Sequence, residues 1–210
     1  MNLFQLAVQN DPNVRTQFDE MKNRSTDGRR QLEAFTDRVQ ETGRVSINMR
    51  PSALTALVNG EGQRNVYEWA DEQSRLSLRP KNEILQEKLG AYFRRRIHFD
   101  DAFDHGRQFR YGALNIGGLG PQNYGQFCTV LRSEFLAPND SVAYLMRDSL
   151  RTYMQTEVDV NTARLQREVT THSHVQYWLL SSTLRKSLHH PKATGRGWCA
   201  GMLATSRRFS

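Results

Sequence analysis

Two segments of the chain alternate between apolar and polar residues, as half-buried strands do. In residues 44–50, RVSINMR, the valine, isoleucine and methionine fall on one face and the serine, asparagine and last arginine on the other. In residues 166–175, QREVTTHSHV, one face carries only polar residues: Gln166, Glu168, Thr170, His172 and His174. The alternation predicts two strands that present Arg50 and Glu168 on polar faces, where a cation and an anion could line one cleft.

Apolar residues at helical spacing predict helices in other parts of the chain. The N-terminal region is expected to be helical as far as Gly43, with a turn at Asp11-Pro12-Asn13. Asn139-Asp140-Ser141 is expected to cap a long helix. The predicted helical segments are residues 1–42, 51–58, 80–90 and 142–154.

The remaining segments are richer in glycine, tyrosine and charge. Residues 111–125 begin like a strand and continue as a turn-rich loop, and residues 126–132 form a further predicted strand. Residues 65–69 fit a strand or a loop, residues 91–110 an irregular segment near a site, and residues 195–201 a closing loop or short edge strand. With no repeat and no long linker, the pattern favours one compact α+β domain.

Composition narrows the class of protein. The 210 residues are 38% hydrophobic, which is enough for a folded core, and no stretch is long and apolar enough to span a membrane. No Sec-type signal is visible at the N-terminus. The two cysteines, Cys128 and Cys199, have no metal-ligand spacing, and a reducing cytosol is the simplest setting. The net charge of +7 suggests a basic surface that attracts an anionic ligand or an acidic protein.

Several motifs resemble an uncharacterised bacterial domain family. They include Tyr111-Gly112-Ala113-Leu114-Asn115, Tyr124-Gly125, Leu131-Arg132, Asn139-Asp140-Ser141 and the Glu168-x-x-x-His172 element. Arg44-Val45-Ser46 with Pro51 matches the early strand of that family, and residues 65–74 match a Phe-Glu…Ser element. The resemblance covers about residues 43 to 176. This matched segment is similar to ADP-ribosyltransferase effectors, including the type that modifies a threonine of host ubiquitin.

This resemblance implies an ADP-ribosyltransferase-like split β-sandwich over residues 43–210, preceded by the helical region 1–42. NAD would be the substrate, with Glu168 and Arg50 as catalytic residues. Glu168 would stabilise the ribose cation, and Arg50 would hold the pyrophosphate or ribose. The expected NAD-binding residues are Arg50, Tyr111, Gly112, Asn115, Tyr124, Gly125 and His172. No metal is expected.

The chain departs from the family pattern at two positions. Arg50 stands where the family often has histidine, and Gln126 stands where a serine commonly follows the Tyr/Phe-Gly pair. The Ser-Thr-Ser signature of arginine-type transferases is therefore absent, and Tyr124 or Thr129 would have to replace it at the ribose.

The resemblance also implies a setting. We expect a monomeric bacterial effector, made in the bacterial cytoplasm and acting in the host cytosol on a host protein such as ubiquitin, with no membrane or nucleic acid as partner. One alternative is a basic, non-enzymatic module that binds an acidic protein or nucleic acid. Another is an NAD glycohydrolase, which passes ADP-ribose to water.

Overall fold

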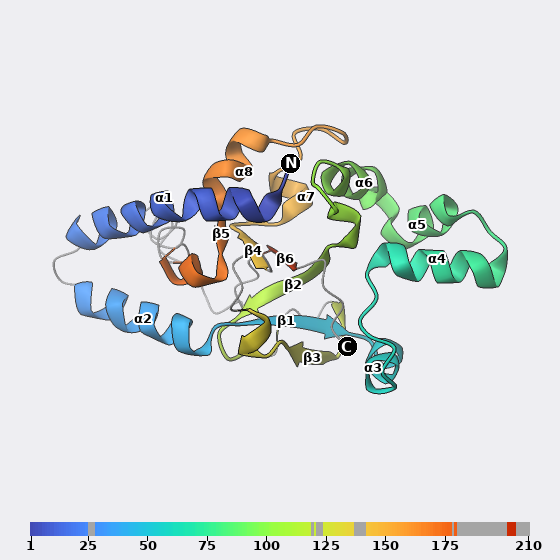
Figure 1. Ribbon diagram of the computed structural model, residues 1–210, viewed down its shortest axis with the longest axis horizontal. Coiled ribbons are helices and arrows are strands. Elements are labelled where there is room, and N and C mark those ends of the chain that lie inside the picture. The colour runs from blue at the N-terminus through green and yellow to red at the C-terminus, as the bar shows by residue number, and fades with distance from the viewer. Residues whose placement is uncertain are drawn as a thin grey trace.

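The chain folds as an α+β protein in which helices surround one antiparallel sheet (Figure 1). The computed structural model describes residues 1–24, 28–118, 120, 124–136, 142–177, 179 and 201–204, the last four by their backbone. The strands of this part of the chain form a single six-stranded sheet in the order β3-β1-β2-β6-β4-β5. A split sandwich would have two sheets.

The strands are short and the helices account for most of the described residues. The strands are β1 (Arg44–Met49), β2 (Arg110–Asn115), β3 (Phe127–Val130), β4 (Val142–Leu145), β5 (Val169–Thr171) and β6 (Gly201–Ala204). The α-helices are α1 (Leu3–Arg24), α2 (Arg29–Thr42), α3 (Pro51–Val58), α4 (Val66–Ser77), α5 (Lys81–Leu89), α6 (Phe93–Asp101), α7 (Ser149–Thr152) and α8 (Thr162–Glu168). The 3-10 turns are η1 (Gly90–Tyr92), η2 (Gly106–Gln108), η4 (Ser133–Phe135) and η5 (His172–His174).

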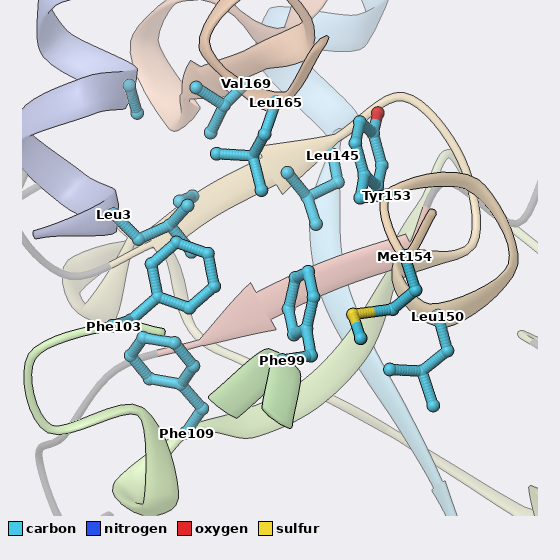
Figure 2. Packing of buried hydrophobic residues seen from close by; sticks show 12 residues of the cluster. Leu3, Phe99, Phe103, Phe109, Leu145, Leu150, Tyr153, Met154, Leu165 and Val169 are labelled. Atoms are coloured by element: carbon cyan, nitrogen blue, oxygen red, sulfur yellow. The ribbon is translucent and has the colours of Figure 1, made fainter. Parts of the chain in front are cut away.

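Each face of the sheet packs against a separate apolar cluster. On one face, the apolar residues of β1 join Leu114 and Tyr144, with Val14 of α1 and Val39 of α2 packed against them. On the other face, β4 and β5 pack against α1, α6 and α8 around Phe99 and Tyr153 (Figure 2). A third, smaller cluster fills the space between α4 and α5. The helices of residues 1–42 are therefore built into the main core.

The alternation predicted for β1 is confirmed, although both of its faces are covered. Val45, Ile47 and Met49 are buried in the core, and Ser46 and Asn48 on the opposite face are buried as well. The reason is the position of β1 between β3 and β2, where loop residues near Gly120 cover the polar face.

The long helix predicted over residues 142–154 is wrong. Residues 142–145 form β4, and only the short helix α7 follows, capped by Asp148, whose side chain accepts from the backbone N–H of Leu150 and Arg151. All of β4 is buried, because it lies between β6 and β5 with apolar clusters on both faces. A short apolar run buried on both sides cannot be assigned to helix or strand from periodicity. The predicted cap at 139–141 lies outside the described residues.

The strand predicted over residues 166–175 is much shorter. Only Val169–Thr171 is strand, because residues 162–168 form α8, capped by Asn161 and supported by an Arg164–Glu168 ion pair one helical turn apart. The polar alternation of this segment therefore does not describe one sheet face.

Other segments are more helical than predicted. Residues 66–77 form α4, which begins with an Asn65–Glu68 capping box, and residues 93–101 form α6. Pro12 lies inside α1, where the flanking Asp11 and Asn10 side chains bond to β5, so tertiary contacts override the predicted turn. Gly201–Ala204 is an interior strand of the sheet, between β2 and β4. The closing loop or edge strand predicted for residues 195–201 lies, except for Gly201, outside the described residues.

Candidate functional site

Arg50 and Glu168, the predicted catalytic pair, lie at opposite ends of the sheet. β1 and β5 run in the same direction and are separated by β2, β6 and β4. Arg50 directly follows the last residue of β1, whereas Glu168 directly precedes the first residue of β5. The structure therefore does not bring the guanidinium and the carboxylate to one dinucleotide, and the sequence prediction of a shared site is wrong.

Glu168 is engaged in a structural contact. The Tyr153 hydroxyl donates to Glu168 Oε2 at 2.9 Å, and Arg164 Nε donates to Oε1 at 3.1 Å. Tyr153 belongs to the core cluster, and its hydroxyl points away from the other labelled side chains, toward the edge of the cluster (Figure 2). Burial raises the pKa of Tyr153, and the charge of Glu168 adds to the rise. The carboxylate thus fastens α8 to the residues after α7.

Tyr111 is also committed to an internal network. Its hydroxyl bonds to Asp100, which is fully buried on α6, and the Arg96 guanidinium lies 3.8 Å from its ring centroid. Burial raises the pKa of Tyr111 well above its usual value, and the charge of Asp100 contributes. The ring face expected to stack on nicotinamide is therefore occupied by Arg96. Gly112, the next residue, lies inside the sheet opposite Met202 of β6.

Asn115 and Gly125 hold loop segments close to strands β2 and β1. Asn115 Nδ2 donates to the carbonyl of Gly118 at 2.7 Å, and its Oδ1 accepts from the Gly118 N–H at 2.6 Å. A Cβ on Gly125 would stand 2.3 Å from the carbonyl carbon of Met49, so glycine is required for the close approach of this loop to β1. The neighbouring Tyr124 is 71% exposed. Close approach to the protein's own strand explains these residues without a ligand.

His172 lies at the opposite end of β5 from Glu168. Its Nδ1 is 2.7 Å from the Tyr144 hydroxyl, and the two rings are stacked. Burial lowers the pKa of His172, and the nearby charge of Arg44 lowers it further. A neutral imidazole is therefore favoured at neutral pH. The expected grouping of His172 with Glu168 is not found.

His174 shows an arrangement that looks like a catalytic triad and cannot act as one. Its Nδ1 is 3.2 Å from Asp11 Oδ2 and 3.1 Å from Ser173 Oγ. A triad uses both ring nitrogens, one toward the carboxylate and the other toward the nucleophile. Here one nitrogen faces both partners, so no proton path leads from serine to carboxylate through the ring.

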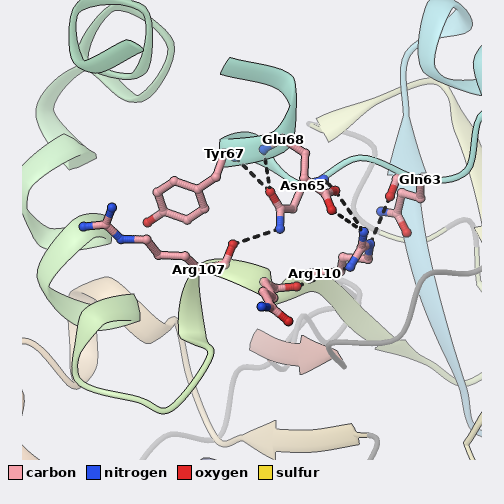
Figure 3. A network of polar contacts seen from close by, with 7 residues as sticks. Gln63, Asn65, Tyr67, Glu68, Arg107 and Arg110 are labelled. Carbon is pink, nitrogen blue, oxygen red and sulfur yellow. Dashed lines mark hydrogen bonds and ion pairs between the residues drawn. The ribbon is translucent and has the colours of Figure 1, made fainter. Parts of the chain in front are cut away.

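A pocket that the sequence prediction missed lies beside the start of α4. It has a volume of about 340 Å³ and mixed charge, and its lining comprises Glu61, Gly62, Gln63, Arg64, Glu68, Asp71, Glu72, Arg75 and Arg110. Figure 3 shows part of its wall, where the first turn of α4 meets the start of β2. Its volume is at the lower end of the range of about 300–1,000 Å³ common for small-molecule sites.

The carboxylate of Glu68 is held by a side chain and by the backbone of the pocket wall. Arg110 Nη2 lies 3.1 and 2.9 Å from its two oxygens, and the Asn65 backbone N–H donates to Oε2 at 2.9 Å. The Arg110 side chain is only 2% exposed, and its Nε donates to the Gln63 carbonyl at 3.0 Å, whereas the Glu68 side chain is 37% exposed. Arg110 therefore orients Glu68, and Glu68 faces the solvent side of the pocket.

The other guanidinium groups of the pocket are more accessible. Arg64 pairs with Glu61 at 2.8 Å and with Glu72, and its side chain is 35% exposed. No acidic side chain of the described residues forms an ion pair with Arg75, which is exposed. The pocket thus offers carboxylates and guanidinium groups together, which suits a ligand carrying both charges.

A sequence signal for this pocket did exist. Asn65-x-x-Glu68 is a capping-box spacing, and the same residues fall in the Phe-Glu…Ser-like element, here Tyr67-Glu68…Ser74. Arg110 had no such signal, because its role depends on the contact between α4 and β2.

Comparison of the chain with protein-family models, curated proteins and solved structures gave no match. Across the described ranges, each helix is too short or too polar to cross a bilayer. In that same part of the chain, no cluster of three or more His, Cys, Asp or Glu side chains could hold a metal ion.

Proposed function

We propose that this protein is an NAD-dependent ADP-ribosyltransferase whose site is the pocket at the start of α4. The activity is the one that the motif resemblance implies. The observation that carries the new location is the Glu68 carboxylate, held by the buried Arg110 at the wall of a pocket and lying in a motif element of the resemblance. The sequence-based pair, Arg50 and Glu168, is not part of this site.

The charges of the pocket are complementary to NAD. NAD combines a positively charged nicotinamide ring with an anionic pyrophosphate. Glu68 would accept a hydrogen bond from the ribose 2′-hydroxyl and stabilise the cation that forms at C1′. Arg64 and Arg75 would bind the pyrophosphate, since guanidinium groups form paired hydrogen bonds with phosphate oxygens. The pocket would hold one part of the dinucleotide, with the rest extending over its rim.

The reaction would exchange one bond at C1′ for another. The bond from C1′ to the nicotinamide nitrogen breaks, and nicotinamide leaves as a neutral molecule with the bonding electron pair. A hydroxyl of the acceptor protein then bonds to C1′ and gives up its proton to solvent. A threonine of ubiquitin is the acceptor that the resemblance suggests, and a bacterial effector acting in the host cytosol is the corresponding setting.

Two matched substitutions test this proposal. The protein is incubated with labelled NAD and either ubiquitin or host lysate, and free nicotinamide, free ADP-ribose and labelled protein are measured. We expect Glu68→Gln to lower turnover at least about 100-fold, the scale on which loss of a group that stabilises transition-state charge acts. Glu168→Gln should retain the turnover of the folded fraction. Label on protein indicates a transferase, and free ADP-ribose alone indicates the glycohydrolase.

Two outcomes would reject the proposal. A wild-type protein that releases no nicotinamide and labels no protein is not an ADP-ribosyltransferase under these conditions. Loss of turnover in Glu168→Gln with full turnover in Glu68→Gln would return the catalytic role to the residue predicted from sequence.

A second candidate, a basic binding module, is favoured by the distribution of charge. Residues 169–210 contain six of the 29 Lys and Arg residues and none of the 22 Asp and Glu residues, so this segment carries most of the net charge of +7. Binding of an acidic protein or nucleic acid through it would weaken steeply with salt. Such binding should be unchanged in Glu68→Gln, and a chain that ignores NAD but shows this salt dependence would support the module.

A further inference from the structure

Asp100 joins the two elements that form the wall of the pocket. It lies on α6 and is fully buried. Tyr67 of α4 donates its hydroxyl to Asp100 Oδ2 at 2.7 Å, and Tyr111 of β2 donates its hydroxyl to Oδ1. Each carboxylate oxygen therefore receives a hydroxyl from a different element, and the single carboxylate bridges α4 to β2.

The two tyrosines are the direct neighbours of the pocket pair. Tyr67 precedes Glu68 on α4, and Tyr111 follows Arg110 on β2. The same two dipeptides thus meet twice: through the Glu68–Arg110 ion pair at the pocket and through Asp100 behind it. Because consecutive residues share a rigid peptide unit, fixing the tyrosines also fixes the backbone positions from which Glu68 and Arg110 reach each other.

The charge of Asp100 is matched inside the protein. Arg96, one helical turn earlier on α6, has Nη1 3.5 Å from Asp100 Oδ1 and lies over the Tyr111 ring. A buried carboxylate is costly unless it is paired and hydrogen-bonded, and here a guanidinium and two hydroxyls meet both requirements. The two hydroxyls come from α4 and from β2, the two elements that carry Glu68 and Arg110. Pairing the charge of Asp100 would need only Arg96 of the same helix.

We infer that Asp100 is a positioning residue of the pocket, which acts through Tyr67 and Tyr111 to set the geometry of Glu68 against Arg110. For its effect on catalysis this inference rests on the proposed function. For its effect on the pocket wall it does not, because the order of the first turn of α4 can be measured without any ligand.

The test compares two variants, one that loses a hydroxyl bonded to Asp100 and one that loses a hydroxyl bonded to another carboxylate. Tyr67→Phe deletes a hydroxyl that donates to Asp100, and Tyr153→Phe deletes a hydroxyl that donates to Glu168 of α8. Both substitutions leave a ring and lose one bond to a carboxylate, so we expect similar decreases in melting temperature. Neither requires removal of a buried charge, so both proteins should fold.

Hydrogen exchange separates a positioning role from a general loss of stability. The backbone amides of Tyr67 and Glu68 bond to Asn65 Oδ1, so they report the order of the first turn of α4. We expect Tyr67→Phe to speed exchange of residues 65–70 by about tenfold under native conditions, corresponding to about 1.4 kcal/mol. Tyr153→Phe should change it by less than about twofold, because the hydrogen bond that it removes joins Tyr153 to Glu168 of α8 and not to α4. Equal changes in the two variants, or no change in either, would overturn the inference.

Turnover of NAD supplies the second measurement. Where the wild-type protein consumes NAD, we expect Tyr67→Phe to lower kcat by about tenfold at saturating NAD, while Tyr153→Phe keeps the wild-type kcat. Equal losses of kcat would overturn the positioning role. Where the wild-type protein does not consume NAD, the proposed function fails, and the exchange of residues 65–70 alone decides whether Asp100 holds the pocket wall.

Discussion

Asp11 is expected to be one of the most important single residues for stability, because it accepts hydrogen bonds along the buried outer edge of β5. β5 ends the sheet, and α1 passes beside it (Figure 1). Asp11 Oδ1 accepts from the Thr171 backbone N–H at 3.0 Å and from Thr170 Oγ1 at 2.6 Å, while Oδ2 accepts from Thr171 Oγ1 at 2.6 Å. The preceding Asn10 donates to the Val169 carbonyl at 2.7 Å. Two helix side chains thus replace the strand that β5 lacks on this side.

Asp11→Ala would leave these donors without their acceptor in a buried place. A hydrogen bond to a charged group contributes about 1.5–3 kcal/mol, and a buried donor left unpaired costs about 1–3 kcal/mol. The three bonds share one carboxylate and the hydroxyls can turn toward other partners, so their effects do not add fully. We expect a loss of about 3–5 kcal/mol, a large part of the total of about 5–15 kcal/mol typical of a folded domain.

Urea denaturation followed by circular dichroism measures this loss. The matched control is Asp19→Ala, which removes the same side chain from the same helix, where Asp19 forms an exposed ion pair with Arg15. Exposed pairs contribute about 0–1 kcal/mol, so the control should remain close to the wild-type protein. A loss below about 1 kcal/mol for Asp11→Ala, or equal losses for the two variants, would refute the role assigned to Asp11.

Three further predictions follow from single residues. Leu78 has a φ of 57° and is 91% exposed, so Leu78→Gly should raise the free energy of unfolding by about 1 kcal/mol, and a lower melting temperature would contradict this. Gly125→Ala should cost about 1–3 kcal/mol, because the new Cβ would overlap the backbone of Met49, and an unchanged urea midpoint would contradict this. Burial lowers the pKa of His172 from its usual 6.5, so the unfolded protein binds a proton at this side chain more readily than the folded protein does. The stability that the neutral imidazole contributes is therefore fully present above pH 6.5 and is lost as the pH falls below 6.5. His172→Gln should flatten the dependence of the urea midpoint on pH between about 5 and 7, and an unchanged dependence would exclude His172 as its source.

The sequence predicted elements well where one physical signal dominated. The alternation of residues 44–50 identified β1, and Pro51 marked the start of α3, because proline suits the first helical turn. The mixed α+β class was also predictable. The fold class follows from the presence of both helical and strand periodicity in the sequence, and it does not depend on which strands pair.

Elements whose identity depends on their neighbours were not predictable. The apolar run of β4 reads equally well as a helix face, and its pairing with β5 and β6 decides the matter. Pro12 favours a turn locally, but the bonds that Asn10 and Asp11 make with β5, more than 150 residues away in the chain, keep it inside α1. Neither pairing leaves a mark in the local sequence.

The same distinction explains why the predicted site differs from the observed pocket. Arg50 and Glu168 were paired because each stood at a polar position of an expected strand, but charge and periodicity say nothing about which ends of which strands meet. The partner of Glu68 was not predictable either, because Arg110 lies 42 residues further along the chain and reaches Glu68 only through the packing of α4 against β2. Arg110 is identified by its burial in the structure, because a buried guanidinium is costly unless a carboxylate pairs with it. Glu68, the partly exposed partner of that buried cation, is therefore the residue that places the proposed site in this pocket, and a functional Glu68→Gln protein would remove the reason for placing any chemistry there.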